Sequence, residues 1–536
     1  MWGVDTMNLL IDRSAPHMKT GQNTSAKSCR IIGSDTLSVR DVVDIAAGRS
    51  TVALSENDRF TRRIDAGAEY LERLLADGGT IYGVTTGYGD SCTVAVPSEL
   101  VAELPLHLTR YHGCGLGEHL PPEAVRAVLV ARLVSLAQGA SGVRRVLLER
   151  LVDLLNHDLL PRIPCEGSVG ASGDLTPLSY VAATLVGERE ALFRGELTMA
   201  ADAWKALGIA PLTLAPKEGL AIMNGTSVMT GLACLAVARA EYLTRLCCRI
   251  TALASVAMRG NPEHFDPRLF AVKPHAGQIE AARWIWEDLG GTSTTSDSEG
   301  VRLQDRYSIR CAPHVIGVAR DALSWIRRDV ENELNSANDN PIIDGEAGWV
   351  LHGGHFYGGH IAFAMDGLKT AVANLADLMD RQLALLVDSR YNHGLPQNLS
   401  GTVGPRAPIN HGFKAVQIGT SAWTAEALKL TMPASVFSRS TECHNQDKVS
   451  LGTIAARDCL RILELTEQVA AALVLATVQA AELRFRGEAP ALTAACAGFA
   501  ATVRAYSEFL DEDRPLEGDL RRTIELIRSR HWNLDA

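Results

Sequence analysis

Aromatic residues are scarce in this 536-residue chain, and an excess of basic charge is missing. Phe, Trp and Tyr make up 5% of the residues, which favours helices over a β-sandwich because aromatic side chains are enriched in strands. Acidic residues number 62 against 52 basic ones. That balance argues against a general binder of nucleic acids or anionic membranes.

Paired cysteine motifs and long apolar runs are also absent. The 11 cysteines are scattered, and no two stand in a C-x-x-C spacing, so neither a zinc site nor a disulfide framework is indicated. The first residues lack a basic segment followed by an apolar one, and we expect a cytoplasmic protein with reduced thiols. The longest apolar run, Val469 to Ala481, is too short to span a bilayer and predicts a buried helix.

Long helical patterns dominate the chain beyond Leu220, so we expect a mainly α fold. Their broad apolar stripes are typical of helices buried in a large bundle. The predicted long helices are 227–259, 313–333, 361–387, 421–430 and 450–483, and the shorter ones begin near residues 37, 69, 121 and 143. No strand-rich block is visible. We predict a polar tail over 1–35, a smaller domain over 36–225 and a helical bundle domain over 226–536.

Two glycine-rich segments interrupt the helical patterns. Five glycines between Gly78 and Asp90 predict a loop around Tyr82, because glycine is costly inside a helix. The second segment, Gly167 to Ser179, reads GSVGASGDLTPLS. It fits an ordinary loop before a helix, whereas a nucleophile elbow needs G-x-S-x-G and a Walker loop needs Gly-Lys-Ser/Thr, and neither is present.

A further interpretation makes the peptide itself the reagent. The unhindered nitrogen of Gly173 can attack the carbonyl carbon of Ala171, and loss of water followed by loss of the Ser172 hydroxyl leaves a methylidene-imidazolone (MIO). This group is an electrophile that ordinary side chains do not supply. A helix N-terminus beneath it favours developing negative charge.

The segment 167–179 resembles the signature of the aromatic amino acid ammonia-lyases and aminomutases. Further matches run from about residue 37 to about 530, over the segments 82–89, 219–226, 307–313, 335–341 and 445–447. The resemblance implies a bundle of the fumarase/aspartase type, with the MIO formed from Ala171, Ser172 and Gly173 and no external cofactor. It also implies a homotetramer whose active sites take residues from three subunits.

The resemblance assigns roles to single residues. Tyr82 matches the base that removes the β-proton, and its pKa is expected to be lowered for work near neutral pH. Arg310 matches the residue that binds the substrate carboxylate, with Asn340 beside it. The remaining matches are Asn224 and Tyr307 near the MIO and amine, Gln304 and Gln446 in the hydrogen-bond network, Phe356 near the ring, and Glu442 and Lys414 at the polar rim.

Two further groups have open interpretations. Asp174 fits an acid or base in MIO formation and equally an N-cap of the following helix. His352, His355 and His360 have no rigid metal-binding spacing and no partner carboxylate, so we predict no metal site. The family pattern has Asn where this chain has His355, and we expect that change to alter hydrogen bonding beside Phe356.

The substrate is predicted from two adjacent residues that contact the ring in this family. Counting back from Gly113-x-Gly115 gives Thr109 and Arg110, which match no standard class, while His107 and Leu108 match the tyrosine pair after a shift of two residues. Histidine ammonia-lyases carry Glu at the position of Gln446, which disfavours histidine. A polar pair can recognise a phenolic hydroxyl, so we expect tyrosine or another hydroxylated aryl-alanine, then phenylalanine.

The expected activity is therefore elimination of ammonia from an aromatic amino acid to give the aryl-acrylate. A 2,3-aminomutase that returns the amine to Cβ needs the same residues. A helical scaffold without activity is disfavoured by the intact Tyr82, Ser172, Asn224 and Arg310, and the fumarase-like lyases by the absence of their Gly-Ser-Ser-x-Met-Pro loop.

Overall fold

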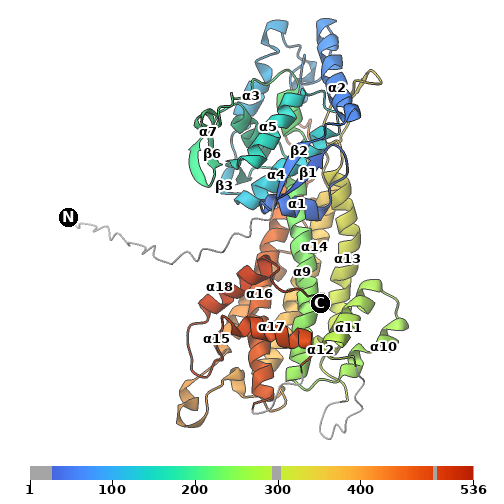
Figure 1. The fold of residues 1–536 in the computed structure, drawn as a ribbon. Coiled ribbons are helices and arrows are strands. Elements are labelled where there is room, and N and C mark those ends of the chain that lie inside the picture. Colours follow the sequence, from blue (N-terminus) through green and yellow to red (C-terminus); the bar gives the residue numbers. More distant parts are fainter. Residues whose placement is uncertain (1–26, 292–302, 487–491, 535–536) are drawn as a thin grey trace, which may run out of the picture.

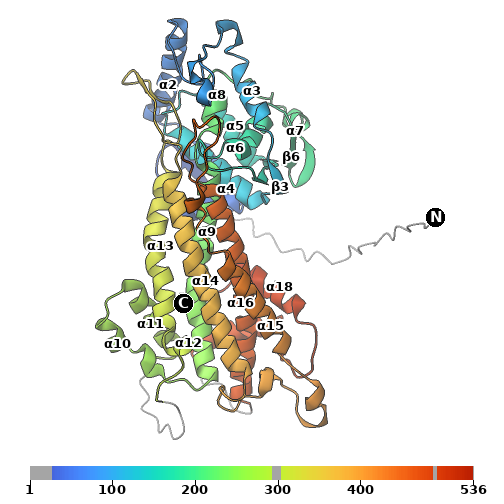
Figure 2. The same ribbon diagram turned by 180° about the vertical axis from the view of Figure 1, so that it is seen from behind.

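The computed structural model describes residues 27–291, 303–486 and 492–534. Its helices place a compact head at one end of a long bundle (Figures 1 and 2). The model is 59% helical, and the predicted mainly α class with a long-helix bundle is confirmed.

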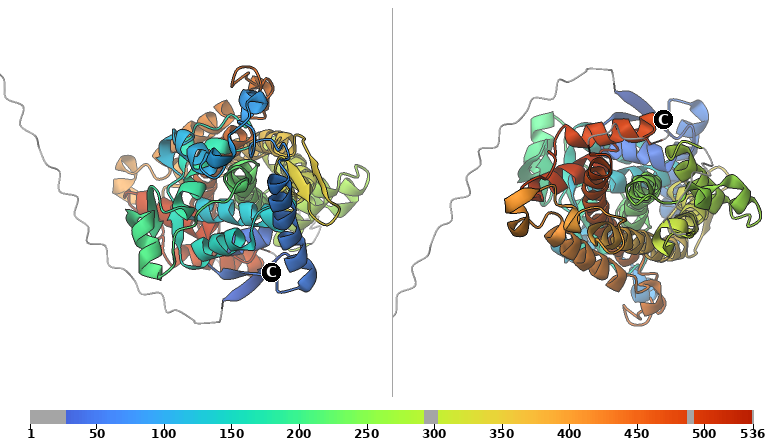
Figure 3. Two further views of the ribbon diagram at one scale, coloured as in Figure 1. Left: turned by 90° about the horizontal axis from the view of Figure 1, so that it is seen from above. Right: turned by 90° about the horizontal axis from the view of Figure 1, so that it is seen from below.

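Five helices build the bundle, and each covers a stretch in which the sequence predicts a helix. They are α9 (Ser227–Ala257), α13 (Ala312–Leu334), α14 (Gly359–Val387), α15 (Lys414–Lys429) and α16 (Gly452–Arg484). The apolar run from Val469 to Ala481 lies within α16 and is buried throughout. Seen along the long axis, α9 stands end-on near the middle of the bundle (Figure 3).

The head consists of shorter helices and the small sheets. Its helices are α1 (Val39–Ala46), α2 (Asp58–Ala76), α3 (Leu104–Tyr111), α4 (Pro122–Ala137), α5 (Arg145–Asn156), α6 (Leu175–Leu185), α7 (Ala200–Leu207) and α8 (Glu218–Met223). Helix α1 begins where expected because Ser38 and Asp41 form a capping box, which satisfies free N–H groups of the first turn. Proline at the start of α4 suits its first turn because it has no N–H group that would lack a partner there.

Short strands are the elements that the sequence analysis missed. The sheets pair β1 (Ser28–Ile32) with β2 (Ser50–Leu54), β3 (Leu116–His119) with β5 (Pro164–Glu166), β4 (Leu159–Pro161) with β6 (Glu190–Phe193) and β7 (Glu196–Met199), and β8 (Ile342–Asp344) with β9 (Trp349–Leu351). Strands of three to five residues are too short to show an alternating pattern. Strand β1 also corrects the predicted tail over 1–35, of which residues 1–26 lie outside the described part.

Smaller helices pack along the bundle outside the head. They are α10 (Pro267–Ala271), α11 (Ala276–Asp288), α12 (Tyr307–Arg310), α17 (Ala494–Arg504) and α18 (Glu517–Arg528). One hydrophobic core runs from α1 and α4 in the head through α9 into α14 and α16, so the division into domains at residue 226 stays a prediction. In the described residues, no helix combines the length and apolar character needed to cross a membrane.

Candidate active site

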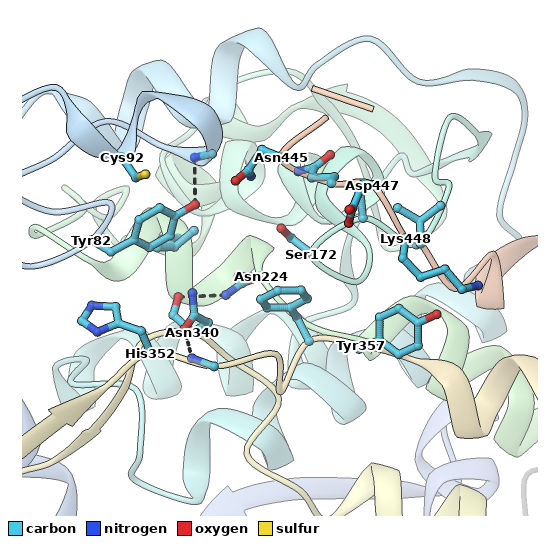
Figure 4. Close-up of a pocket in the computed structure, with 18 of the residues that line it drawn as sticks. Tyr82, Cys92, Ser172, Asn224, Asn340, His352, Tyr357, Asn445, Asp447 and Lys448 are labelled. Carbon is cyan, nitrogen blue, oxygen red and sulfur yellow. Dashed lines mark hydrogen bonds between the residues drawn. The ribbon is translucent and has the colours of Figure 1, made fainter. Parts of the chain in front are cut away.

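A cavity of about 670 Å³ lies in the head, between segments that are far apart in the sequence. Its walls come from the loop around Tyr82, the turn at Ala171 and Ser172, the start of the chain after α8, the segment around Phe356 and the segment around Gln446. Figure 4 shows Tyr82, Ser172, Asn224 and Asn340 around this space. The cavity therefore brings together seven of the predicted residues: Tyr82, Ala171, Ser172, Asn224, Asn340, Phe356 and Gln446.

The loop that carries Tyr82 folds over one side of the cavity. The Gly89 N–H donates a hydrogen bond to Tyr82 Oη at 2.8 Å. Glu442 holds the same loop, because the Asp90 N–H donates to both of its carboxylate oxygens at 2.8 and 3.1 Å. Glu442 thus contacts the loop rather than lining the cavity.

The expected lowering of the Tyr82 pKa is wrong for the single chain. Burial raises the pKa of Tyr82, and the nearby negative charge of Glu442 raises it further, while the hydrogen bond from Gly89 opposes both. Burial has this effect because it penalises the charged phenolate. A positive group close to the Tyr82 oxygen would be needed to reverse the shift.

The tripeptide at 171–173 adopts an unusual turn. Ser172 has φ +47° and Gly173 has φ +77°, a region that side chains with a Cβ rarely adopt. A Cβ on Gly173 would lie 2.1 Å from the carbonyl oxygen of Gly225. Only glycine fits this position, and it lies against the backbone beside Asn224.

Asp174 is completely buried directly behind this turn. Its carboxylate accepts hydrogen bonds from the N–H groups of Val228 and Met229, both at 3.0 Å, and from the hydroxyl groups of Ser168 and Thr453. Asp174 precedes α6 but caps the N-terminus of α9 instead, so the N-cap interpretation named the wrong helix. Burial raises the pKa of Asp174 to about 6.

Two residues just before the tripeptide, Val169 and Gly170, contact the start of α16. The Leu451 N–H donates to the carbonyl oxygen of Val169 at 3.0 Å, and a Cβ on Gly170 would lie 2.3 Å from the Ser450 hydroxyl. Asp174, the start of α9 and the start of α16 therefore fix the turn from three sides.

Asn224 and Asn340 lie side by side at the floor of the cavity. The Asn224 side-chain amide donates to Asp339 Oδ1 at 3.1 Å and to the Asn340 carbonyl oxygen at 2.9 Å. The Asn340 side-chain oxygen accepts a bond from the Gly353 N–H at 2.8 Å. Both side chains are thus held by contacts within the segment 338–353.

Four predicted residues lie away from this cavity. Arg310 and Tyr307 belong to α12, at the end of the bundle opposite the head (Figure 1). Tyr307 is 72% exposed, and the Arg310 guanidinium lies over its ring, 4.7 Å from the centroid. Gln304 precedes this helix, and Lys414 begins α15 in the same half of the molecule.

The predicted selectivity residues also lie outside the cavity. Thr109 is fully buried and donates to the Pro105 carbonyl oxygen at 3.0 Å, whereas Arg110 points outward and pairs with Glu188 at 2.6 Å. The His107 side chain is 64% exposed and 4.0 Å from Glu103. None of the three is placed to contact a substrate ring in this chain.

Tyr111 is the residue of this helix that the sequence analysis overlooked. Burial and the charges of Tyr82 and Glu442 raise its pKa, so its hydroxyl lies within electrostatic range of both groups. Counting back from Gly115-Leu116-Gly117 instead of Gly113-Cys114-Gly115 selects Tyr111 and His112. The second glycine pair was therefore a usable signal.

Several lining residues carried no assigned role. The His352 ring packs edge-on against Tyr82, with centroids 6.5 Å apart, and Cys92, Tyr357 and Asn445 line the cavity. His352 was considered only as part of a histidine series for a metal. Its position in the segment 352–356, which also contains Phe356, indicated that it lies in the same site.

Comparison with known proteins places this geometry in a family. Residues 37–505 match the family described as aromatic amino acid lyase. The chain is 36% identical to a histidine ammonia-lyase of Caldanaerobacter subterraneus, over 93% of this chain and 96% of the relative. For a histidine ammonia-lyase of Gloeobacter violaceus the identity is 37%, over 92% and 95%.

Solved structures give the same result. A tyrosine aminomutase from Streptomyces globisporus superposes with a TM-score of 0.87 at 34% identity, covering 94% of this chain and 97% of its own. A histidine ammonia-lyase from Trypanosoma cruzi superposes with a TM-score of 0.85 at 30% identity, covering 94% of both chains.

The comparisons overturn the predicted preference for tyrosine or phenylalanine. Six curated relatives, 34–37% identical over most of the chain, are named histidine ammonia-lyase. Part of that prediction rested on Thr109, Arg110 and His107, which the structure places outside the cavity, and part rested on Gln446, which lines it. With its fold, its cavity and its relatives in agreement, the chain belongs to the aromatic amino acid lyase family and is a carbon–nitrogen lyase.

Proposed function

We propose that the protein eliminates ammonia from L-histidine to give the imidazolyl-acrylate. The name shared by the six curated relatives carries this proposal. In the reaction the β-proton leaves Cβ, the amine leaves Cα as ammonia, and a carbon–carbon double bond remains. The residues below do the binding and proton transfer that this requires.

We propose that Ala171, Ser172 and Gly173 close into the MIO group. The fit is favourable because Ser172 and Gly173 already have positive φ angles, and the absence of a Cβ on Gly173 allows its contact with Gly225. The Ser172 carbonyl oxygen accepts a bond from the Gly225 N–H at 2.9 Å, which ties the turn to the residue after Asn224. Once formed, the group supplies an electrophile for the substrate amine.

Tyr82 is our candidate for the base that removes the β-proton. Its oxygen lies at the cavity and accepts the hydrogen bond from Gly89, which stabilises a phenolate. A cation close to its oxygen would oppose the raised pKa of Tyr82. Arg310 from a second chain would supply that charge while it binds the substrate carboxylate.

Gln446 is compatible with an imidazole ring although histidine ammonia-lyases carry Glu at its position. Its side-chain oxygen accepts a bond from the Thr441 hydroxyl at 2.9 Å, which leaves the amide NH2 group as a donor. A neutral imidazole has one ring nitrogen that accepts a hydrogen bond. Gln446 therefore suits the neutral ring, whereas a carboxylate would suit its N–H.

We further propose a homotetramer with shared active sites. Gln304, Tyr307, Arg310 and Lys414 lie at the far end of the bundle from Tyr82, so one chain does not assemble the predicted set. Antiparallel association of bundles would bring one chain's α12 to another chain's head. Exposed apolar side chains along the bundle, such as Val318, Phe363 and Ile418, suit such packing.

Mixing inactive variants tests the shared site. Tyr82→Phe and Arg310→Ala are each expected to be inactive alone, but their co-assembled mixture is expected to regain activity, because some sites receive both native residues. If an assembly shown to contain both variants stays inactive, Tyr82 and Arg310 of different chains do not form one active site.

Two measurements test the reaction and the group. Ammonia release is measured with L-histidine, L-tyrosine and L-phenylalanine in parallel. Release from tyrosine or phenylalanine but not from histidine would refute histidine as the substrate. The intact mass is expected to be lower than the sequence mass by two water molecules, and Ser172→Ala is expected to lack this loss. A full-length mass without the loss in the native chain would refute MIO formation. A cytoplasmic location stays a prediction.

A further inference from the structure

Lys217 is a buried lysine directly beneath the cavity floor. Its Nζ lies 2.5 Å from Asp339 Oδ2, and neither side chain is exposed to solvent. Removing two charges from water costs several kcal/mol for each ion. A buried pair of this kind is weak evidence for a role in stability, so its position beside the site needs another explanation.

The backbone of Lys217 carries a second cost. Its φ is +78° at the residue that precedes α8, a conformation that costs about 1–3 kcal/mol for a residue with a Cβ. Helix α8 ends at Met223, immediately before Asn224. The strained residue and the cavity residue are therefore the two ends of one short, buried helix.

The carboxylate of Asp339 connects this lysine to Asn224. One oxygen accepts from Lys217, and the other accepts from the Asn224 side-chain amide at 3.1 Å and from the Asn340 N–H at 2.7 Å. The Asn224 amide also donates to the Asn340 carbonyl oxygen (Figure 4). Because both neighbours only accept hydrogen bonds, a flipped amide would set oxygen against oxygen.

We propose that Lys217 and Asp339 are positioning residues that hold Asn224 with its side-chain oxygen available to the cavity. In this orientation Asn224 accepts a hydrogen bond from the substrate's amine, while its NH2 group stays bound below. Lys217 donates to one carboxylate oxygen of Asp339, and the other oxygen holds the Asn224 amide by its NH2 side. The inference rests on the proposed ammonia elimination, because it names the amine as the group that Asn224 meets.

Arg132 holds the backbone of Asn224, so that Lys217 can be tested for its effect on the Asn224 side chain alone. Its guanidinium donates to the carbonyl oxygens of Asn224 at 2.8 Å and Asn338 at 3.1 Å, and to Ser135. These bonds hold the backbone at Asn224 and Asn338 without involving Lys217. Loss of Lys217 is thus expected to release the Asn224 amide while the backbone remains in place.

The bundle contains a matched control. Lys369 on α14 is also unexposed, and its Nζ lies 2.8 Å from Asp366, but neither residue lines the cavity. Lys217→Met and Asp339→Asn are expected to lower kcat about 10- to 100-fold, the usual effect of removing a partner that orients a catalytic group. Lys369→Met is expected to lower the melting temperature and leave kcat unchanged.

A double-mutant cycle separates positioning from general damage. If Lys217 acts through Asn224, then Lys217→Met is expected to change kcat less than about twofold in an Asn224→Ala background. The intact mass of Lys217→Met is expected to keep the loss of two water molecules. The cycle uses whichever common amino acid the native protein deaminates, so failure with histidine refutes the proposed substrate and leaves this inference testable.

Three results would overturn the inference. The first is an equal loss of kcat in Lys217→Met and Lys369→Met. The second is a full additional loss when Lys217→Met is combined with Asn224→Ala. The third is a Lys217→Met protein whose intact mass does not show the loss of two water molecules. Its inactivity would then come from the missing MIO group. Absence of ammonia release from every common amino acid would overturn both proposals.

Discussion

Replacing Asp174 by asparagine is expected to change how the stability of the protein depends on pH. Burial raises the pKa of Asp174 from 3.8 to about 6, and the side chain has no exposed surface. Between these two values the folded state binds more protons than the unfolded state. The stability therefore falls as the pH rises from about 4 to about 6.

The size of this effect follows from the shift. Each pKa unit corresponds to 1.36 kcal/mol, so the change from 3.8 to about 6 corresponds to about 3 kcal/mol between the protonated and ionised forms. At ~2.1 cal/mol/K for each of 536 residues, the entropy of unfolding is ~1.1 kcal/mol/K. The corresponding change in melting temperature is ~3 °C.

The assay compares the melting temperatures of the native protein and Asp174→Asn from pH 4 to pH 7. All other titrating groups are shared, so the difference between the two curves isolates Asp174. We expect the variant to gain ~3 °C relative to the native protein over this range, because the amide never ionises in its buried site. A pH-independent difference, or one that changes in the opposite direction, would refute the raised pKa.

Three other predictions concern the cavity and its loop. Tyr82→Phe is expected to lower kcat at least ~100-fold with little change in KM, and an unchanged kcat for ammonia release would exclude Tyr82 as the base. Gly89→Ala would place a Cβ 2.3 Å from Glu442 Oε2 at a residue with φ +60°, so we expect faster proteolysis of the loop 78–93 and a lower kcat. Equal cleavage rates would show that Glu442 does not hold this loop. Arg110→Ala is expected to leave the ratio of kcat/KM between amino acids unchanged, whereas Tyr111→Ala is expected to change it, and the reverse outcome would restore the original selectivity pair.

Long helices were predictable because their apolar pattern and capping residues lie within one continuous segment. The apolar pattern of α16 repeats over its 33 residues, and Ser38 with Asp41 marks the start of α1 within four positions. The tripeptide at 171–173 was equally visible, since the MIO closure that it predicts involves only adjacent residues. Short strands such as β4, with three residues, depend on a distant partner and give no local pattern.

Contacts between distant segments explain the other errors. Asp174 stands before α6 in the sequence, yet its hydrogen bonds reach α9 and α16, which no local rule for N-caps includes. The pKa of Tyr82 depends on its burial and on Glu442, 360 positions away. The orientation of Arg110 depends on which face of α3 packs on the core. Leu108 and Thr109 face the core, and the next residue of the helix therefore points to solvent.

The contacts of the turn at 171–173 also set an order of events during synthesis. Its shape depends on Gly225, on the first N–H groups of α9 and on Leu451 and Thr453 at the start of α16. The ribosome delivers Thr453 some 280 residues after the turn itself, counted from position 173 to position 453. A nascent chain, or one truncated before α16, therefore has the tripeptide without the surroundings that bend it. The proposed MIO closure is expected only once nearly the whole protein has been made.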